Sequence, residues 1–106
     1  MNRDKFLLML GLSKRAGAAI IGTPMVIAAL KEKRIEVVFY PMDASANTEK
    51  KINDKCAFYG VKCIRTEYTS DQLGNAVGKL GAVCAIGITD KSFSNELSTL
   101  NLNEKR

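Results

Sequence analysis

The chain has 106 residues, 46% of them hydrophobic, and a net charge of +5. That length and apolar content suffice for one hydrophobic core, so we expect a single domain over residues 1–106. Its 16 lysines and arginines against 11 acidic residues favour a polyanionic partner such as a nucleic acid. Histidine is absent and no cysteines form a C-x-x-C pair, which argues against an ordinary zinc site and a paired disulfide framework.

No segment of the sequence is typical of export or of a membrane span. The first apolar stretch covers only residues 6–12, and no signal-type cleavage site follows it. A spanning helix needs about 20 apolar residues, and no run approaches that length. Cys56, Cys63 and Cys84 are odd in number and are interpreted as buried thiols of a reducing compartment. We therefore expect a cytoplasmic protein.

The first elements alternate between helix and strand. Apolar residues at helical spacing predict an amphipathic helix over residues 3–16. The apolar run at 18–21 predicts a strand. Thr23 followed by Pro24 predicts the start of a second helix over 24–33, because threonine can cap free N–H groups and proline has no N–H to leave unpaired.

The same alternation continues to the C-terminus. The further predicted elements are a strand at 37–40 buried on both faces, a helix from about 47 to a cap at Gly60, a strand at 62–65, a helix after Thr69 with an apolar stripe reaching Leu80, a strand at 83–88, and a helix through Phe93, Leu97 and Leu100. The polar tail 101–106 is expected to be frayed. This order predicts an α/β fold, a three-layer α/β/α sandwich.

Catalytic patterns are weak. Without histidine, catalysis needs a carboxylate pair or an activated cysteine or lysine, and no convincing set is present. Asp43 follows a strand and is interpreted either as a catalytic acid or, by preference, as a turn residue bonding its own backbone. Gly74 lies inside a helix, where it indicates a close packing contact or an approach to a ligand, packing being preferred. We expect no enzyme and no cofactor.

Basic residues are clustered along the sequence and suggest a nucleic-acid surface. Lys14 and Arg15 end the first predicted helix, where they also complement the helix dipole. We expect this pair, the start of the second helix, the loop after residue 40 and the glycine-containing loop at 78–81 to converge on one edge. Free helix N–H groups, glycine backbone and positive charge together suit phosphates and splayed bases.

Several blocks of the sequence resemble a known family. The blocks are Leu-Ser-Lys-Arg-Ala-Gly at 12–17, Gly22, Asp-Ala-Ser-Ala-Asn-Thr at 43–48, and Leu-Gly-Asn-Ala-Val-Gly-Lys at 73–79. In this order and spacing they resemble the L7Ae/L30e/S12e ribosomal protein family, and within it the small bacterial YlxQ-type proteins. The resemblance extends from about residue 5 to residue 100.

The resemblance implies an L30e-like sandwich with a central four-stranded mixed sheet that binds kink-turn RNA as a monomer within a ribonucleoprotein. In this family the N-terminus of the second helix contacts tandem sheared G·A pairs, and an apolar loop before the last strand contacts an extruded base. Gly22 matches the glycine that opens the RNA-contacting turn, and Leu80 matches the apolar loop residue. No membrane, small-molecule substrate or cofactor is implied.

The second helix departs from the family pattern. Archaeal and eukaryotic members carry Gly-x-Asn-Glu-x-x-Lys, whereas the last three named positions here are Pro24, Met25 and Ala28. Their side chains cannot hydrogen-bond guanine edges or reach a phosphate, so recognition must rest on backbone, shape and nearby charge. The predicted RNA-binding residues are Lys14, Arg15, Gly22, Thr23, Pro24, Met25, Ala28, Lys33, Asp43, Lys79, Leu80 and Gly81. The alternative is a protein-interaction module of a ribosomal or transcriptional assembly, using the apolar face at 25–28.

Overall fold

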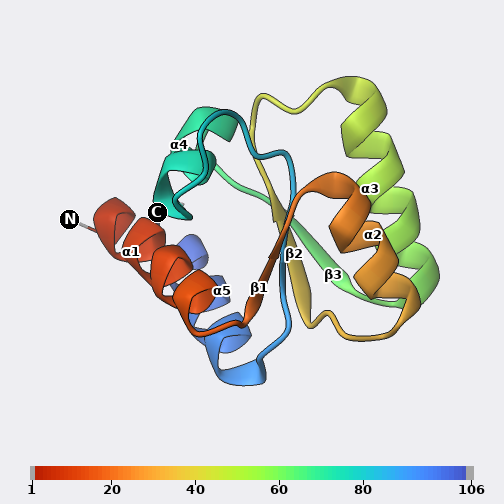
Figure 1. Ribbon diagram of the computed structural model, residues 1–106, viewed down its shortest axis with the longest axis horizontal. Helices are drawn as coiled ribbons and strands as arrows, with labels where there is room; N and C mark the ends of the chain where they lie inside the picture. The colour runs from red at the N-terminus through yellow and green to blue at the C-terminus, as the bar shows by residue number, and fades with distance from the viewer. Residues whose placement is uncertain (1, 105–106) are drawn as a thin grey trace.

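A computed structural model describes residues 2–104 as five helices packed on a four-stranded sheet (Figure 1). The elements are α1 (Asn2–Arg15), β1 (Ala19–Ile21), α2 (Thr23–Lys31), β2 (Val37–Tyr40), α3 (Ala46–Tyr59), β3 (Lys62–Arg65), α4 (Ser70–Ala76), β4 (Ile86–Ile88) and α5 (Lys91–Glu104). Helices cover both faces of the sheet, so the predicted α/β/α sandwich is confirmed.

The sheet is mixed, with strand order β1-β4-β2-β3. β4 runs antiparallel to both β1 and β2, whereas β2 and β3 are parallel. β1, β2 and β3 therefore all end where β4 begins. We call this the upper end of the sheet, as Figure 1 shows it. The loops that follow the first three strands gather there with the loop that precedes β4.

The core lies on both sides of β2, whose four residues are all buried as predicted. Val37 and Phe39 face α1, α4 and α5, and Val38 and Tyr40 face α2 and α3. On the first side, the Phe6 ring meets Phe39 edge-on, with centroids 5.4 Å apart. Alternation along one strand thus divides the core into two layers.

The start of α2 differs from the prediction. Gly22, not Thr23, occupies the N-cap position, with φ 99° and ψ 143°, and no side chain caps the helix. The carbonyl of Gly22 accepts the first helical bond from the Val26 N–H at 2.9 Å. Glycine adopts this left-handed backbone without a Cβ clash, so Thr23 becomes the first helical residue and its predicted capping role is wrong.

The segment after α4 is a loop, which we call the 77–85 loop. The predicted helical stripe to Leu80 is wrong, and so is the strand assigned to residues 83–85. Gly78 and Gly81 have φ of 76° and 99°, values that neither a right-handed helix nor a strand permits. Val77 and Val83 remain buried at the two ends of the loop.

The last helix is longer than predicted. α5 continues through Glu104, and Asn101, assigned to the frayed tail, is only 4% exposed. Residues 105–106 of the expected tail lie outside the described residues. Within residues 2–104, no helix combines the length and the apolar character needed to cross a membrane.

Asp43 fastens the β2–α3 loop to the start of α4. Its carboxylate accepts from the Ser70 N–H at 2.8 Å and from the Ser70 hydroxyl at 3.1 Å. Thr69 and Gln72 form the capping box predicted at the same helix start. The interpretation of Asp43 as a turn residue bonding its own backbone is wrong, because its partner lies 27 positions later. A carboxylate at this position also complements the helix dipole.

Gly74 allows the 77–85 loop to pack against α4. A Cβ at this position would overlap the carbonyl oxygen of Gly81. The Lys79 N–H donates to the Gly74 carbonyl at 2.9 Å, so loop and helix meet backbone to backbone. The preferred interpretation of Gly74, a close packing contact, is confirmed.

Gly74→Ala is expected to lower the free energy of unfolding by about 1–3 kcal/mol, because the added methyl group must displace the loop backbone. The better helix propensity of alanine offsets only part of this loss. Urea denaturation measures the change. Asn75→Ala, at an exposed position of the same helix, is the matched control and should stay within about 0.5 kcal/mol of the parent. Equal stability of the two variants would contradict the packing role.

Candidate nucleic-acid interface

A shallow depression of about 420 Å³ lies at the upper end of the sheet, between the start of α2 and the 77–85 loop. It brings together the turn and the loop that the sequence predicted to converge. Its lining consists of Ile21, Gly22, Thr23, Pro24, Lys79, Leu80, Ala82, Val83 and Cys84. Apart from Lys79, both walls are therefore built by loop backbone and small or apolar side chains.

One backbone hydrogen bond joins the two walls. The Gly22 N–H donates to the carbonyl oxygen of Ala85 at 2.9 Å. This bond continues the β1–β4 ladder by one step, since Ile21 is paired with Ile86. The start of α2 and the end of the loop are thus held in fixed register.

The first turn of α2 leaves backbone donors open. No described residue accepts a hydrogen bond from the N–H of Thr23 or Met25, and Pro24 has no N–H. Because no side chain caps the helix, these two groups remain available at the positive end of the helix dipole. The arrangement is suited to an oxyanion or a base carbonyl.

Leu80 stands at the tip of the 77–85 loop with its side chain fully exposed. The exposed Lys79 and Gly81 flank it. The loop is anchored before the tip by the Lys79 bond to α4, and after it by the Val83 N–H, which donates to the Ser70 carbonyl at 3.0 Å. An apolar side chain and a cation are therefore held in solvent beside the depression.

The outer side of α2 is partly apolar and exposed. Met25 is 62% exposed and Ala28 is exposed, whereas Val26 is fully buried and Ile27 half-buried. The apolar face predicted at 25–28 therefore divides between core and surface, with Met25 beside the start of the helix.

Three predicted basic residues lie away from the depression. Lys14 and Arg15 end α1 at the lower end of the sheet, where the Thr89 N–H bonds the Ala18 carbonyl. Lys33 follows the C-terminus of α2, a helix about 13 Å long that starts at the depression. The expected convergence on one edge is wrong for Lys14 and Arg15, because β1 separates them from the upper end. Lys33 is separated from the depression by the length of α2. Lys79 does line the depression.

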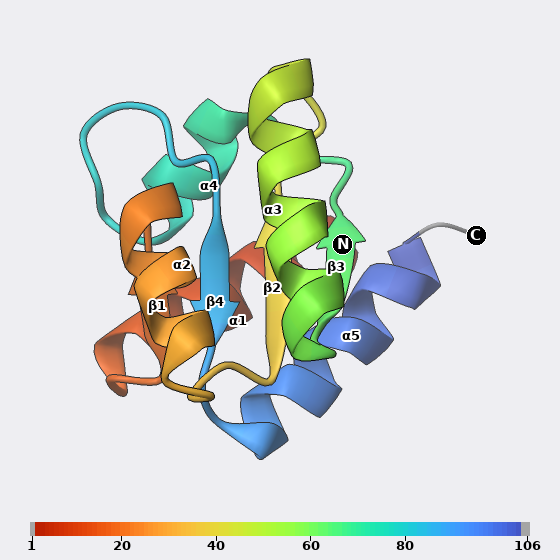
Figure 2. The same ribbon diagram turned by 90° about the vertical axis from the view of Figure 1, so that its right-hand side faces the viewer.

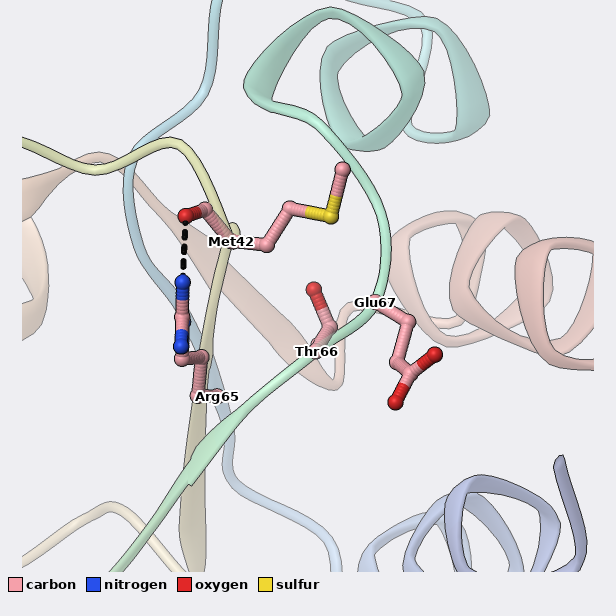
Figure 3. Close-up of a pocket in the computed structure, with 4 residues that line it drawn as sticks. All are labelled: Met42, Arg65, Thr66 and Glu67. Atoms are coloured by element: carbon pink, nitrogen blue, oxygen red, sulfur yellow. Dashed lines mark hydrogen bonds between the residues drawn. The ribbon is translucent and has the colours of Figure 1, made fainter. Parts of the chain in front are cut away.

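A second hollow, of about 350 Å³, lies at the upper end and is lined by Met42, Arg65, Thr66 and Glu67. Figure 3 shows these four side chains. The Arg65 guanidinium donates to the Met42 carbonyl at 2.9 Å, and the buried Thr66 hydroxyl donates to the Tyr40 carbonyl at 3.0 Å. These polar groups hold loops together. No pattern in the sequence indicated this hollow, because its members come from two segments without a shared motif.

The three cysteines differ in burial, and the hydrogen bond between Cys56 and Cys63 lowers the pKa of Cys56. Cys56 is fully buried, but Cys63 and Cys84 are half-buried, so the expectation of three buried thiols is wrong for these two. The hydrogen bond with Cys56, followed by burial, raises the pKa of Cys63. Its thiol therefore stays protonated near neutral pH, and a protonated thiol is a poor nucleophile.

Solved structures share this architecture. A protein from Bacillus halodurans C, described as of unknown function, superimposes with a TM-score of 0.84 at 33% identity, covering 91% of this chain and 95% of that one. The Giardia lamblia 15.5kD RNA binding protein superimposes with a TM-score of 0.76 at 15% identity, covering 96% and 86% of the two chains. At such low identity the second match concerns the fold alone.

The relatives found by sequence bear on the family as well as on the fold. The protein from Enterococcus faecium named RNA-binding protein YlxQ is 34% identical over 99 residues, which is 93% of each chain. Its namesake from Bacillus subtilis (strain 168) is 37% identical over 92 residues, 87% of this chain and 90% of the relative. The model of the ribosomal protein L7Ae/L30e/S12e/Gadd45 family matches residues 4–98. This chain therefore belongs to the ribosomal protein L7Ae/L30e/S12e/Gadd45 family.

Proposed function

We propose that this protein binds RNA, specifically kinked RNA of the kink-turn type, at the depression between α2 and the 77–85 loop. The observation that carries the proposal is that Thr23, with its open N–H group, and the fully exposed Leu80 line one shallow depression, while the open N–H of Met25 lies in the same helical turn as Thr23. The names of the two YlxQ relatives, which describe RNA-binding proteins, support the choice of ligand. The proposal includes no reaction and no cofactor.

In this proposal, α2 recognises RNA through its backbone N–H groups. The two free N–H groups hydrogen-bond phosphate or base oxygens, and the helix dipole strengthens both contacts. Pro24 and Met25 offer no hydrogen-bonding side chain toward base edges. The site therefore reads the shape of a kinked backbone more than its sequence.

The 77–85 loop supplies the complementary contacts. Leu80, together with the exposed Met25, offers apolar surface to a base that has left its stack. Lys79 binds a phosphate, and the Gly81 backbone allows close approach. Asp43 is left out of the interface because both of its carboxylate oxygens bond Ser70. Lys14, Arg15 and Lys33 act only through the long-range positive potential.

Leu80→Ser is expected to weaken binding of a kink-turn RNA about tenfold, because the extruded base loses its apolar contact. Affinity for a plain duplex of equal length should not change. Gel-shift titrations at two salt concentrations measure both affinities. Leu8→Ser, an exposed leucine on α1, is the control and should leave both values unchanged. Equal, weak binding of kink-turn and duplex by the parent protein would contradict specific recognition.

Lys79→Ala should make the plot of log affinity against log salt less steep, by about the amount that one phosphate contact contributes to the slope. Lys14→Ala removes the same charge in the last turn of α1, which ends at the other end of the sheet, and should leave that slope nearly unchanged. The comparison is made with the same kink-turn RNA. If Lys14→Ala produced the larger change in slope, the RNA would have to lie on the lower end of the sheet.

A second candidate function is a protein-interaction module, favoured by the 62% exposure of Met25. Met25→Glu places a charge on this surface without altering the core. If RNA is the ligand there, the added negative charge should weaken kink-turn binding in the gel-shift titration. Unchanged RNA affinity, with loss of a protein that co-purifies with the parent, would instead support the interaction module.

A further inference from the structure

The outer face of α3 carries an aromatic ring that is not buried in the core. Phe58 is 80% exposed, whereas every other aromatic side chain among the described residues is buried or half-buried. It lines a hollow of about 400 Å³ together with Lys51, Asp54 and Lys55. Positions 51, 55 and 58 follow one another at helical spacing and share one stripe of the helix surface.

The charges around this ring are unbalanced. The Lys50 ammonium forms an ion pair with the Asp54 carboxylate at 2.9 Å. The acidic group that lines the hollow therefore already has a partner. Within the described part of the chain, neither Lys51 nor Lys55 has an ion-pair partner. Two free cations therefore precede the exposed ring on the same stripe of α3.

The ring is supported from one side. Tyr59 meets Phe58 edge-on, with centroids 4.8 Å apart and planes at 85°. Such a contact restricts the motion of the phenyl ring while most of its surface stays open to solvent. A supported ring beside two free lysines has the composition of a stacking platform for single-stranded nucleic acid.

We propose that the outer face of α3 is a second RNA contact, specific for an unpaired segment, in which a base stacks on Phe58 and phosphates bind Lys51 and Lys55. Charge favours this occupant over a protein, since a protein-docking site depends on apolar area and this stripe offers one ring beside two cations. The proposal goes beyond the kink-turn site and does not depend on it.

The two contacts are separate but share one side of the molecule. α2 and α3 lie side by side on the same face of the sheet, as Figures 1 and 2 both show. The depression lies beside the N-terminus of α2, at the upper end. Phe58 lies near the C-terminus of α3, a helix about 21 Å long that begins at the same upper end. An RNA that touches both must cross this face.

The sequence contains no tryptophan, so a single substitution provides a specific optical probe. In the variant Phe58→Trp, a short oligouridylate is expected to quench the indole fluorescence, because a stacked base contacts the ring. Leu8→Trp places the same probe at a 60% exposed position of α1 and is the matched control, expected to show no quenching. Equal quenching at both positions, or none at Phe58→Trp, would overturn the proposal.

The lysines are tested in the same background. Lys51→Ala combined with Lys55→Ala should weaken the oligouridylate affinity of Phe58→Trp about tenfold, whereas Lys5→Ala with Lys91→Ala, at exposed positions on α1 and α5, should not. A duplex that quenches as strongly as the single strand would overturn the stacking role. Adding Leu80→Ser should leave the quenching unchanged, so failure at α3 and failure at the depression are told apart.

Discussion

The hydrogen bond from Gly22 to Ala85 is the interaction on which the candidate site depends. It extends the β1–β4 ladder to the point where α2 starts, and it places the 77–85 loop beside the first turn of that helix. Two segments more than 50 residues apart in the sequence become two walls of one depression. Gly22 serves twice, because its N–H completes the ladder while its positive φ opens the helix.

Local patterns predicted the elements well and their junctions poorly. Strands 37–40 and 62–65 were located to the residue, because β-branched and apolar runs between turn signals are local features. Leu80 was assigned to α4 because it continues the apolar stripe of that helix. Its actual place depends on the backbone packing of Gly74 against Gly81, a contact between neighbouring segments that no periodicity encodes.

The two walls of the candidate site could be predicted from the sequence, but the positions of the basic residues around it could not. The family resemblance indicated both Gly22 and Leu80, and the structure brings their segments together. Lys14 and Arg15 are near Gly22 in sequence, yet β1 carries the chain from one end of the sheet to the other between them. Sequence proximity misleads wherever a strand intervenes. The α3 hollow carried no motif, since lysines on a helix are usually a solvated face.

The anchoring of the 77–85 loop has a thermodynamic consequence. Hydrogen bonds from Lys79 and Val83 fix the backbone on both sides of Leu80, so little conformational entropy remains to be lost when a ligand docks there. The loop acts as a preorganised wedge and not as a segment that folds on contact. Under the proposed function, the RNA would then supply most of the structural adjustment, and the energy needed to kink it would be the source of selectivity.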